Sequence, residues 1–347
     1  MSVMNSGPLD HASAAGLGQR WYPRHTASLM SVVASGVLLF LLYRRLDIRL
    51  IGEALLRADR FWLVISVGMI LPITVLRAFR FYSVAPAGAL PGIPEALRLT
   101  LAASALNLVL PAKTGDLIKS YFVATRGKTS TGVSIAIIMY ERLCDLFGLL
   151  SWGLLGWLIG RPLIPGLPSA IWLLLGVFWM VCAGLISSER AAALLRTLLA
   201  RVLPHGKFRK LHDLADGWPD LLRVLRGRRR WIISLSLVLW LTHLFQMWMF
   251  TVALLVSVPV AIFVSLVSLA LMAGQLPMTL AGLGTRDVAL VLLLSRYMPP
   301  ESAAALGVLV ATRNLVPPLV GIPMMGRYLS SVVGEARRWR KERARAE

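Results

Sequence analysis

The chain has 347 residues, of which 57% are hydrophobic and 16% are charged, and its mean hydropathy is +0.70. A soluble chain carries roughly 45–50% apolar and about 25% charged residues, so this composition excludes a soluble enzyme and indicates an integral membrane protein. The charges are unbalanced, with 37 Lys and Arg against 17 Asp and Glu and a net charge of +20. In a membrane protein this excess is typical of cytoplasmic loops and of contact with anionic lipid, so we expect no nucleic-acid partner.

Residues 1–25 form a predicted disordered N-terminal segment. No cleavage pattern of small residues follows the first apolar window, which predicts an uncleaved anchor rather than a secretory signal. About 20 apolar residues are needed to cross the hydrocarbon. Eight windows are predicted spans: Ala27–Tyr43, Phe61–Val84, Ala96–Leu110, Val133–Ile159, Ala170–Ile186, Trp231–Val256, Val260–Leu276 and Ala303–Leu329. The fold class is therefore an all-α polytopic membrane helix bundle with about eight spans, over residues 26–334.

Residues 189–230 are the one sizeable predicted connection outside the membrane. They hold eleven Lys or Arg, against the acids Glu189, Asp213, Asp216 and Asp220. The positive-inside rule places this connection in the cytoplasm, and it predicts the same side for the basic C-terminal tail, residues 335–347. A lipid-touching amphipathic helix explains the connection better than a catalytic domain, because so short a segment is near the lower limit for independent folding.

Eleven ionisable residues fall inside or beside the predicted spans: Arg77, Arg80, Lys113, Asp116, Lys119, Glu141, Arg142, Asp145, Arg286, Asp287 and Arg313. Each would cost about 2.5–3.5 kcal/mol at the bilayer centre, so we expect them to face protein or a wet cavity. Seven are basic and four are acidic, so a cavity that they share would prefer an anion. The alternative for Arg77, Arg80, Lys119 and Arg286 is that they lie at the interface and extend into water.

Spacing adds detail to this set. Glu141 and Asp145 lie four residues apart on one helical face, and Arg142 can pair with Asp145 at a spacing of three. The alternative to a binding site is that these three charges only neutralise one another. His243 is a lone histidine within a span, and we predict that it makes an interhelical hydrogen bond rather than a proton relay. The cysteines, Cys144 and Cys182, offer no disulfide framework and no cysteine-based zinc site, and we expect no metal or cofactor.

The sequence also contains an internal repeat. Three residue types recur at an offset of 171, in the pairs Thr114 and Thr285, Asp116 and Asp287, and Arg142 and Arg313. Two apolar segments too short to span comfortably, Leu117–Ala124 and Val288–Tyr297, also correspond. This pattern predicts a duplication with halves at about residues 96–160 and 260–330.

Each copy has the features of a broken or re-entrant helix. Pro111 and Pro277 remove a backbone donor, and Gly115, Gly282 and Gly284 let the chain turn. Thr114 and Thr285 are suited to N-cap the new half-helices. Irregular backbone at membrane depth is tolerated only where protein or a watery cavity surrounds it, and paired breaks indicate a transporter's substrate site.

Two properties of these breaks stay open at this point. The free amides at the half-helix N-termini favour a phosphate, but Asp116 and Asp287 compete for the same positive ends. These acids carry a proton or pair with Lys113 and Arg286 in the alternative interpretation. The topology is open as well: if both short segments cross, the repeats are inverted, at the expense of a basic loop outside. We favour this arrangement because inverted repeats supply alternating access.

Motifs at these positions resemble a known family. They are Asn107-x3-Pro111-x-Lys113-x-Gly115-Asp116, then Glu141-Arg142-x2-Asp145, then Pro277-x4-Gly282-x-Gly284-x2-Asp287. This order is similar to the lysylphosphatidylglycerol synthase transmembrane region family, also called flippase-like proteins, over roughly Arg77–Gly326. Two positions depart from the family pattern, with Lys113 in place of arginine and Asp287 in place of glutamate. Lysine lacks the planar fork of arginine, so Lys113 would not grip a phosphate in a bidentate way.

The resemblance implies a multi-pass protein of the bacterial inner membrane that moves a lipid with a charged head group between leaflets. In the best-known members an aminoacyl-transferase domain follows the membrane part, and because this chain stops at Glu347 we expect no lysine transfer. We therefore predict a lipid transporter rather than an enzyme. The predicted substrate-binding residues are Arg77, Arg80, Asn107, Lys113, Asp116, Glu141, Arg142, Asp145, Arg286, Asp287 and Arg313.

Two other functions remain alternatives. The first is a membrane-embedded lipid-linked glycosyl or acyl transferase with Asp116, Glu141 or Asp145 as general base. Against it, the sequence has no Asp-x-Asp pair for a metal-bound nucleotide sugar and no histidine beside these carboxylates. The second is a non-catalytic partner that recruits a lipid-modifying enzyme through the basic connection. Membrane lipids are the expected partners in every case, and a homo-oligomer stays open.

Overall fold

A computed structural model describes residues 25–109, 115–127, 130–161, 170–202, 217–275, 279 and 282–346. Every regular element in these residues is a helix, which confirms the predicted all-α class. The disorder predicted before residue 25 and the roles predicted for Pro111, Lys113, Thr114 and Pro277 lie outside the described residues.

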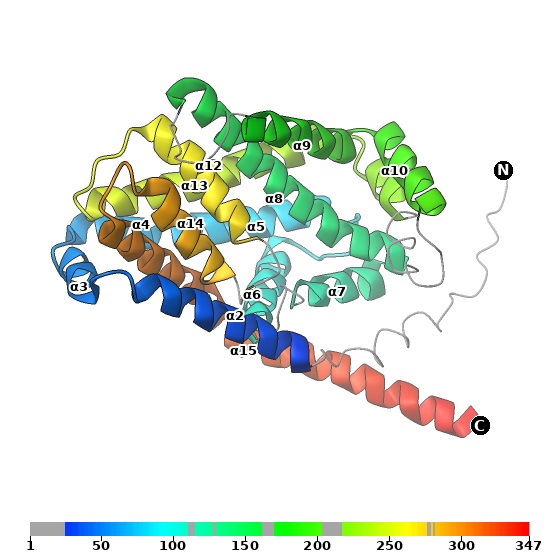
Figure 1. Cartoon of the computed structure of the whole chain (residues 1–347). Coiled ribbons are helices and arrows are strands. Elements are labelled where there is room, and N and C mark those ends of the chain that lie inside the picture. Colours follow the sequence, from blue (N-terminus) through cyan, green and yellow to red (C-terminus); the bar gives the residue numbers. More distant parts are fainter. Residues whose placement is uncertain are drawn as a thin grey trace.

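Figure 1 shows the helices of the described residues, coloured in chain order. Their bounds are α2 His25–Tyr43, α3 Ile48–Leu56, α4 Arg60–Gly68, α5 Ile70–Val84, α6 Ile93–Val109, α7 Leu117–Gly127, α8 Thr131–Gly160, α9 Ala170–Ser187, α10 Glu189–Val202, α12 Arg229–Ala253, α13 Val260–Ala273, α14 Thr285–Leu294 and α15 Pro300–Ala346. Residues 217–224 are helical as well.

Five helical stretches are long and apolar enough to cross a membrane: Arg60–Val84, Gly132–Gly160, Ala170–Ser187, Arg229–Ala253 and Pro300–Gly326. They match five of the eight predicted windows and confirm a polytopic helix bundle. The other three windows form the helices α2, α6 and α13, which are not among these five stretches. The tail predicted after residue 334 is the end of α15, which projects beyond the bundle in Figure 1.

Both predicted helix breaks are present, because α6 ends at Val109 before α7 begins at Leu117, and α13 ends at Ala273 before α14 begins at Thr285. After each break the chain lies back against the helix that it has just left. A Cβ at Gly115 would lie 2.7 Å from the backbone nitrogen of Asn107 in α6. A Cβ at Gly282 would lie 2.4 Å from the carbonyl oxygen of Gly274, and Gly282 has a φ of +79°. Such contacts and such a backbone admit only glycine.

The two short helices cover only part of the membrane. With 11 residues in α7 and 10 in α14, each is roughly 16 Å long, about half the thickness of the hydrocarbon. Neither helix crosses by itself, so full crossing by the two short segments and the inverted topology stay predictions.

The packing between the two predicted repeats is reciprocal. The order long helix, short helix, long helix occurs in α6–α8 and again in α13–α15. The most extensive helix pairings join the first helix of each unit to the last helix of the other, α6 with α15 and α13 with α8. Glycines allow close approach at both contacts: a Cβ at Gly156 would lie 2.6 Å from the carbonyl oxygen of Ala261, and one at Gly321 would meet that of Leu101 at 2.0 Å. This exchange supports the duplication, whose boundaries stay a prediction.

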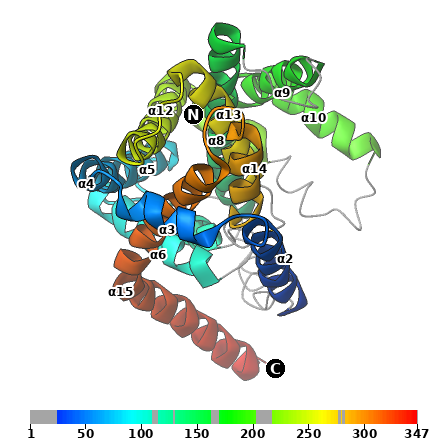
Figure 2. The ribbon, with the colours of Figure 1, turned by 60° about the vertical axis from the view of Figure 1, so that its left-hand side comes forward.

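Helix α12 packs on α4, α5, α8, α13 and α15; Figure 2 shows it beside α4 and α5. It contributes to two apolar clusters. Ile232 belongs to a cluster formed mainly with α5–α9, and Phe250 belongs to a second cluster formed mainly with α13, α14 and the start of α15. The middle of α12 therefore lies where the two clusters meet.

The basic connection begins with the amphipathic helix α10. Its Leu194 and Leu198 are exposed, as a lipid-touching helix requires. Arg229, the first residue of α12, pairs with Glu189, and its Nη1 donates to the carbonyl oxygen of Ser187 at 2.8 Å. The hydrogen bond from Arg229 lowers the pKa of Glu189, so this carboxylate stays charged at neutral pH and fixes the corner between α9, α10 and α12.

Replacing Gly115 or Gly282 with alanine is expected to destabilise the protein by about 1–3 kcal/mol, because backbone must move to admit the new methyl group. The measurement is the thermal unfolding midpoint of the purified protein in detergent. Gly36→Ala in α2 is the matched control, since a Cβ there meets nothing within 4 Å. Equal midpoints for Gly115→Ala and Gly36→Ala would contradict the re-entrant packing.

Candidate functional site

A stripe of polar side chains runs along one face of α12. Ser236, Trp240, His243 and Gln246 are spaced by four, three and three residues, which places them on the same side of the helix. All four are buried. Each contacts a charged side chain from another helix, so the stripe gathers charges from α5, α8 and α15 at the middle of the bundle.

The contacts of the stripe are specific. Arg80 donates to Ser236 Oγ at 3.4 Å, and Trp240 Nε1 donates to Asp145 Oδ1 at 3.1 Å. Arg77 Nη2 lies 3.3 Å from His243 Nε2, and Arg313 Nη1 donates to Gln246 Oε1. The predicted interhelical hydrogen bond of His243 is therefore present, with Arg77 of α5 as its partner.

Beside the stripe, α5, α7 and α8 form a connected cluster of acids and bases. Arg80 Nη1 lies 2.7 Å from Asp145 Oδ1, and Arg80 Nε lies 3.8 Å from Glu141 Oε1. Lys119 Nζ lies 3.4 Å from Glu141 Oε2 and 3.6 Å from Asp116 Oδ1. Buried charges need such partners, because an ion removed from water loses several kcal/mol of solvation.

Arg142 and Asn107 complete this cluster around Asp116. Arg142 pairs with Asp116, and Asn107 Nδ2 donates to Asp116 Oδ1 at 3.3 Å. The ion pairs within 4 Å join Asp145 to Arg80 and Arg142 to Asp116, while the charges of Arg142 and Asp145 act on each other at longer range. The three charges of this turn of α8 are therefore not neutralised by one another alone, because Glu141, Arg142 and Asp145 each also pair with a residue outside α8.

The second break has a different arrangement. Arg286 contacts Asp287 Oδ1 through Nη2 at 2.7 Å and through Nε at 3.0 Å, and its Nη2 also donates to the carbonyl oxygen of Gly307 at 3.4 Å. Asp287 Oδ2 accepts a hydrogen bond from the Gly284 amide at 3.0 Å. The acid itself caps α14, so this amide is not free for a phosphate. The N-cap residue is Gly284, so the N-cap predicted for Thr285 is wrong by one residue.

The alternative that four cations lie at the membrane interface is wrong for three of them. Arg80, Lys119 and Arg286 are buried and paired with carboxylates. Arg77 is exposed, yet its guanidinium lies against His243 in the middle of α12 rather than at a helix end. The predicted site residues therefore fall into two groups, one around Asp116 and the α12 stripe and one at the second break.

Two cations of the site stand apart from the others. Among the described residues, Arg80, Lys119, Arg142 and Arg286 have a carboxylate within 4 Å, whereas Arg77 and Arg313 have none. Arg313 is 6% exposed, and its partner Gln246 is neutral. Because His243 and Gln246 lie one turn apart on α12, the two guanidinium groups are held at neighbouring positions of one helix face. Asp145 and Glu141 act on Arg77 from beyond 4 Å, whereas the charged groups that act on Arg313 are cations.

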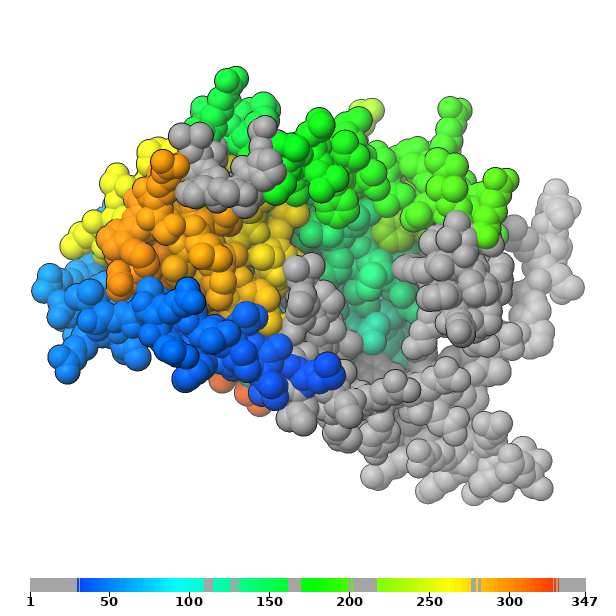
Figure 3. All heavy atoms as spheres, in the orientation of Figure 1, coloured from blue at the N-terminus to red at the C-terminus, as the bar shows by residue number. Residues whose placement is uncertain are grey.

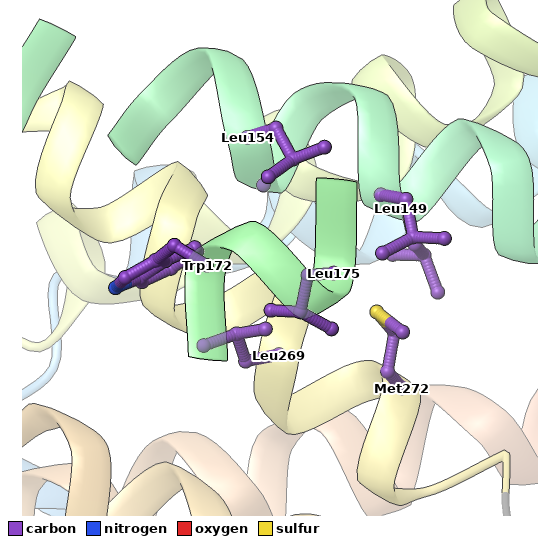
Figure 4. Close-up of a pocket in the computed structure, with 8 residues that line it drawn as sticks. Leu149, Leu154, Trp172, Leu175, Leu269 and Met272 are labelled. Carbon is purple, nitrogen blue, oxygen red and sulfur yellow. The ribbon is translucent and has the colours of Figure 1, made fainter. Parts of the chain in front are cut away.

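The structure has a hollow on its surface and an apolar pocket between its helices. The molecule is hollowed between α9 and α2, with part of α8 at the bottom of the hollow (Figure 3). A separate apolar pocket, too tight for a water molecule, lies between α8, α9 and α13 and is lined by side chains such as Leu154, Trp172 and Met272 (Figure 4). It offers nothing to a charged head group and is too small for a ligand site. The described residues contain no group of three potential metal ligands.

The family model described as lysylphosphatidylglycerol synthase TM region matches residues 28–321. The chain belongs to this family. Membership identifies a multi-pass membrane protein that is involved in lipid handling. A search among curated proteins finds no match.

Sequence reasoning missed most of the α12 stripe. Ser236, Trp240 and Gln246 carry no net charge and therefore did not enter the set of ionisable residues, and Lys119 was left out of the predicted binding residues. The signal that could have found the stripe is the spacing of four polar or polar-tipped residues at helical period within an apolar span. Polar groups at that depth require partners on other helices.

Asp145→Ala is expected to destabilise the protein by roughly 3–5 kcal/mol, because it removes the closest carboxylate from a buried guanidinium. Asp220→Ala is the matched control: Asp220 also pairs with an arginine, but both side chains are more than half exposed. An exposed pair contributes about 0–1 kcal/mol. Thermal unfolding in detergent distinguishes the two, and a small effect at Asp145 would show that Arg80 does not depend on it.

Proposed function

We propose that this protein translocates a lipid with an anionic head group across the bacterial cytoplasmic membrane. The observation that carries the proposal is the pair Arg77 and Arg313, two cations that face neutral acceptors on α12 and have no carboxylate within 4 Å among the described residues. Arg313 is buried, and a buried charge without a counter-ion is unstable in a low-dielectric environment; Arg77 is exposed beside it. A phosphate of the transported lipid would supply the missing negative charge.

The surrounding acid–base cluster suits a site that must release its ligand. Arg142 is paired with Asp116 but its side chain is 31% exposed, so it can exchange the carboxylate for a phosphate and return. The head group would then pass between α5, α12, α8 and α15 while the acyl chains stay in lipid. The units α6–α8 and α13–α15 pack on each other reciprocally, α6 on α15 and α13 on α8. These two units can rock around α12, as alternating access requires.

Membership in a family named for a synthase raises the transferase alternative, which the contacts of the carboxylates disfavour. A general base needs a carboxylate that can take up a proton near the operating pH. Asp116, Glu141 and Asp145 each lie within 4 Å of at least one cation, so their oxygens are engaged in ion pairs within the protein. Their contacts suit the holding of cations.

Arg313→Ala and Arg77→Ala are expected to reduce the flipping of a fluorescent phosphatidylglycerol in proteoliposomes by roughly tenfold or more, because each removes an uncompensated charge from the site. Arg313→Lys retains the charge and should retain part of the rate. Arg98→Ala is the matched control, since Arg98 is exposed and pairs with Glu95 in α6. Flipping that depends on protein but is unchanged in both alanine variants would contradict the proposal.

The inverted topology has its own test. Arg45→Cys is expected to react with a membrane-impermeant maleimide in intact cells, whereas Arg223→Cys on the basic connection should react only after permeabilisation. Both arginines are exposed, and the native Cys144 and Cys182 are buried, so the background is low. Labelling of Arg45→Cys only after permeabilisation would rule out the inverted repeats.

A further inference from the structure

The side-chain amide of Gln246 is fixed at both ends. Its Oε1 accepts a hydrogen bond from Arg313 of α15, and its Nε2 donates to the carbonyl oxygen of Ser66 in α4 at 2.7 Å. Ser66 lies in the last turn of α4, where helix carbonyls lack the usual intrahelical donor. Gln246 is fully buried. The amide therefore cannot rotate without losing both bonds, and it presents its oxygen to Arg313.

A carboxylate at this position would accept the same hydrogen bond and would add a negative charge. In this chain the paired cations of the site, such as Lys119 and Arg286, have carboxylate partners. Arg313 has an amide of the same shape as glutamate instead. Gln246 therefore holds the Arg313 guanidinium in place without adding a negative charge.

The neighbouring stripe position follows the same principle. Because the Arg77 guanidinium can only donate, His243 Nε2 must accept and the imidazole must be neutral, with its proton on Nδ1. The charged groups whose fields act on Arg313 are Arg77 and Arg286, both cations. His243 and Gln246, one turn apart on α12, thus position arginines through neutral acceptors, and Arg313 in addition lies in the field of two further cations.

We propose that Gln246 is a positioning residue that sets the charge selectivity of the lipid site, by holding Arg313 through a neutral amide so that only an anionic head group completes the charge balance. This inference rests on the proposed function and adds the residue that determines which head groups are accepted.

The experiment compares Gln246→Glu with Gln246→Met in proteoliposomes. Both substitutions remove the donor to the Ser66 carbonyl, and they differ mainly in charge. The readout is the ratio of flipping rates for fluorescent phosphatidylglycerol and fluorescent phosphatidylcholine, with the wild type measured in parallel. We expect Gln246→Met to flip more slowly but to keep the wild-type preference for the anionic lipid. Gln246→Glu should lose that preference by roughly tenfold or more.

The outcomes separate the two proposals. If the wild type flips neither lipid, the proposed function fails. If the wild type prefers phosphatidylglycerol and the Glu and Met variants keep that preference equally, the proposed function stands and the role of Gln246 is overturned. A purely structural role predicts this second result, because it slows both variants without changing the ratio.

Stability gives an independent measurement. If Arg313 is uncompensated, glutamate at position 246 gains an ion partner, so Gln246→Glu should have a higher thermal unfolding midpoint than Gln246→Met. The shorter pair Gln246→Asp and Gln246→Asn repeats the comparison. If Gln246→Glu and Gln246→Asp fail to fold while Gln246→Met and Gln246→Asn fold, the proposal is overturned. This result would show that the charge of Arg313 is already balanced.

Discussion

The structure depends on one constraint: a charged side chain within the hydrocarbon must find a partner inside the protein, because no water compensates it there. Arg80 meets this constraint with Asp145 and Glu141 from α8, and Lys119 meets it with Asp116 and Glu141. These pairs tie α5, α7 and α8 together across a long stretch of sequence. A bundle held in this way places its charges at the centre, where they can act on a substrate.

Helix α12 supplies the polar partners for several of the charged side chains. Its apolar residues belong to both hydrophobic clusters, and its polar stripe meets the charges of the surrounding helices. The stripe makes two kinds of hydrogen bond. Trp240 donates one to a carboxylate, whereas His243 and Gln246 accept them from arginines. Arg80 therefore has carboxylate partners, whereas the partner of Arg313 among the described residues is neutral.

The two predicted repeats are therefore alike in architecture and different in chemistry. Arg142 and Arg313 occupy equivalent positions at the offset of 171, yet Arg142 pairs with the acid of its own repeat and Arg313 pairs with Gln246 of α12. Asp287, which would be the equivalent partner, is held by Arg286 and by the Gly284 amide. A duplicated unit in a single chain can diverge in this way, so that one copy supports the fold and the other contributes a free charge.

The sequence by itself determined the membrane bundle, the position of both breaks and the set of ionisable residues, because composition, proline and glycine act locally and apolar length is set by the bilayer. Only the tertiary structure decided the partners. The ion pair of Arg142 within 4 Å is with Asp116, just before α7, and not with Asp145 one turn away, and Gln246 matters only because α15 and α4 meet beside it. Ion pairs at membrane depth are chosen by which helices pack together, and that choice follows from the whole bundle rather than from the spacing within one helix.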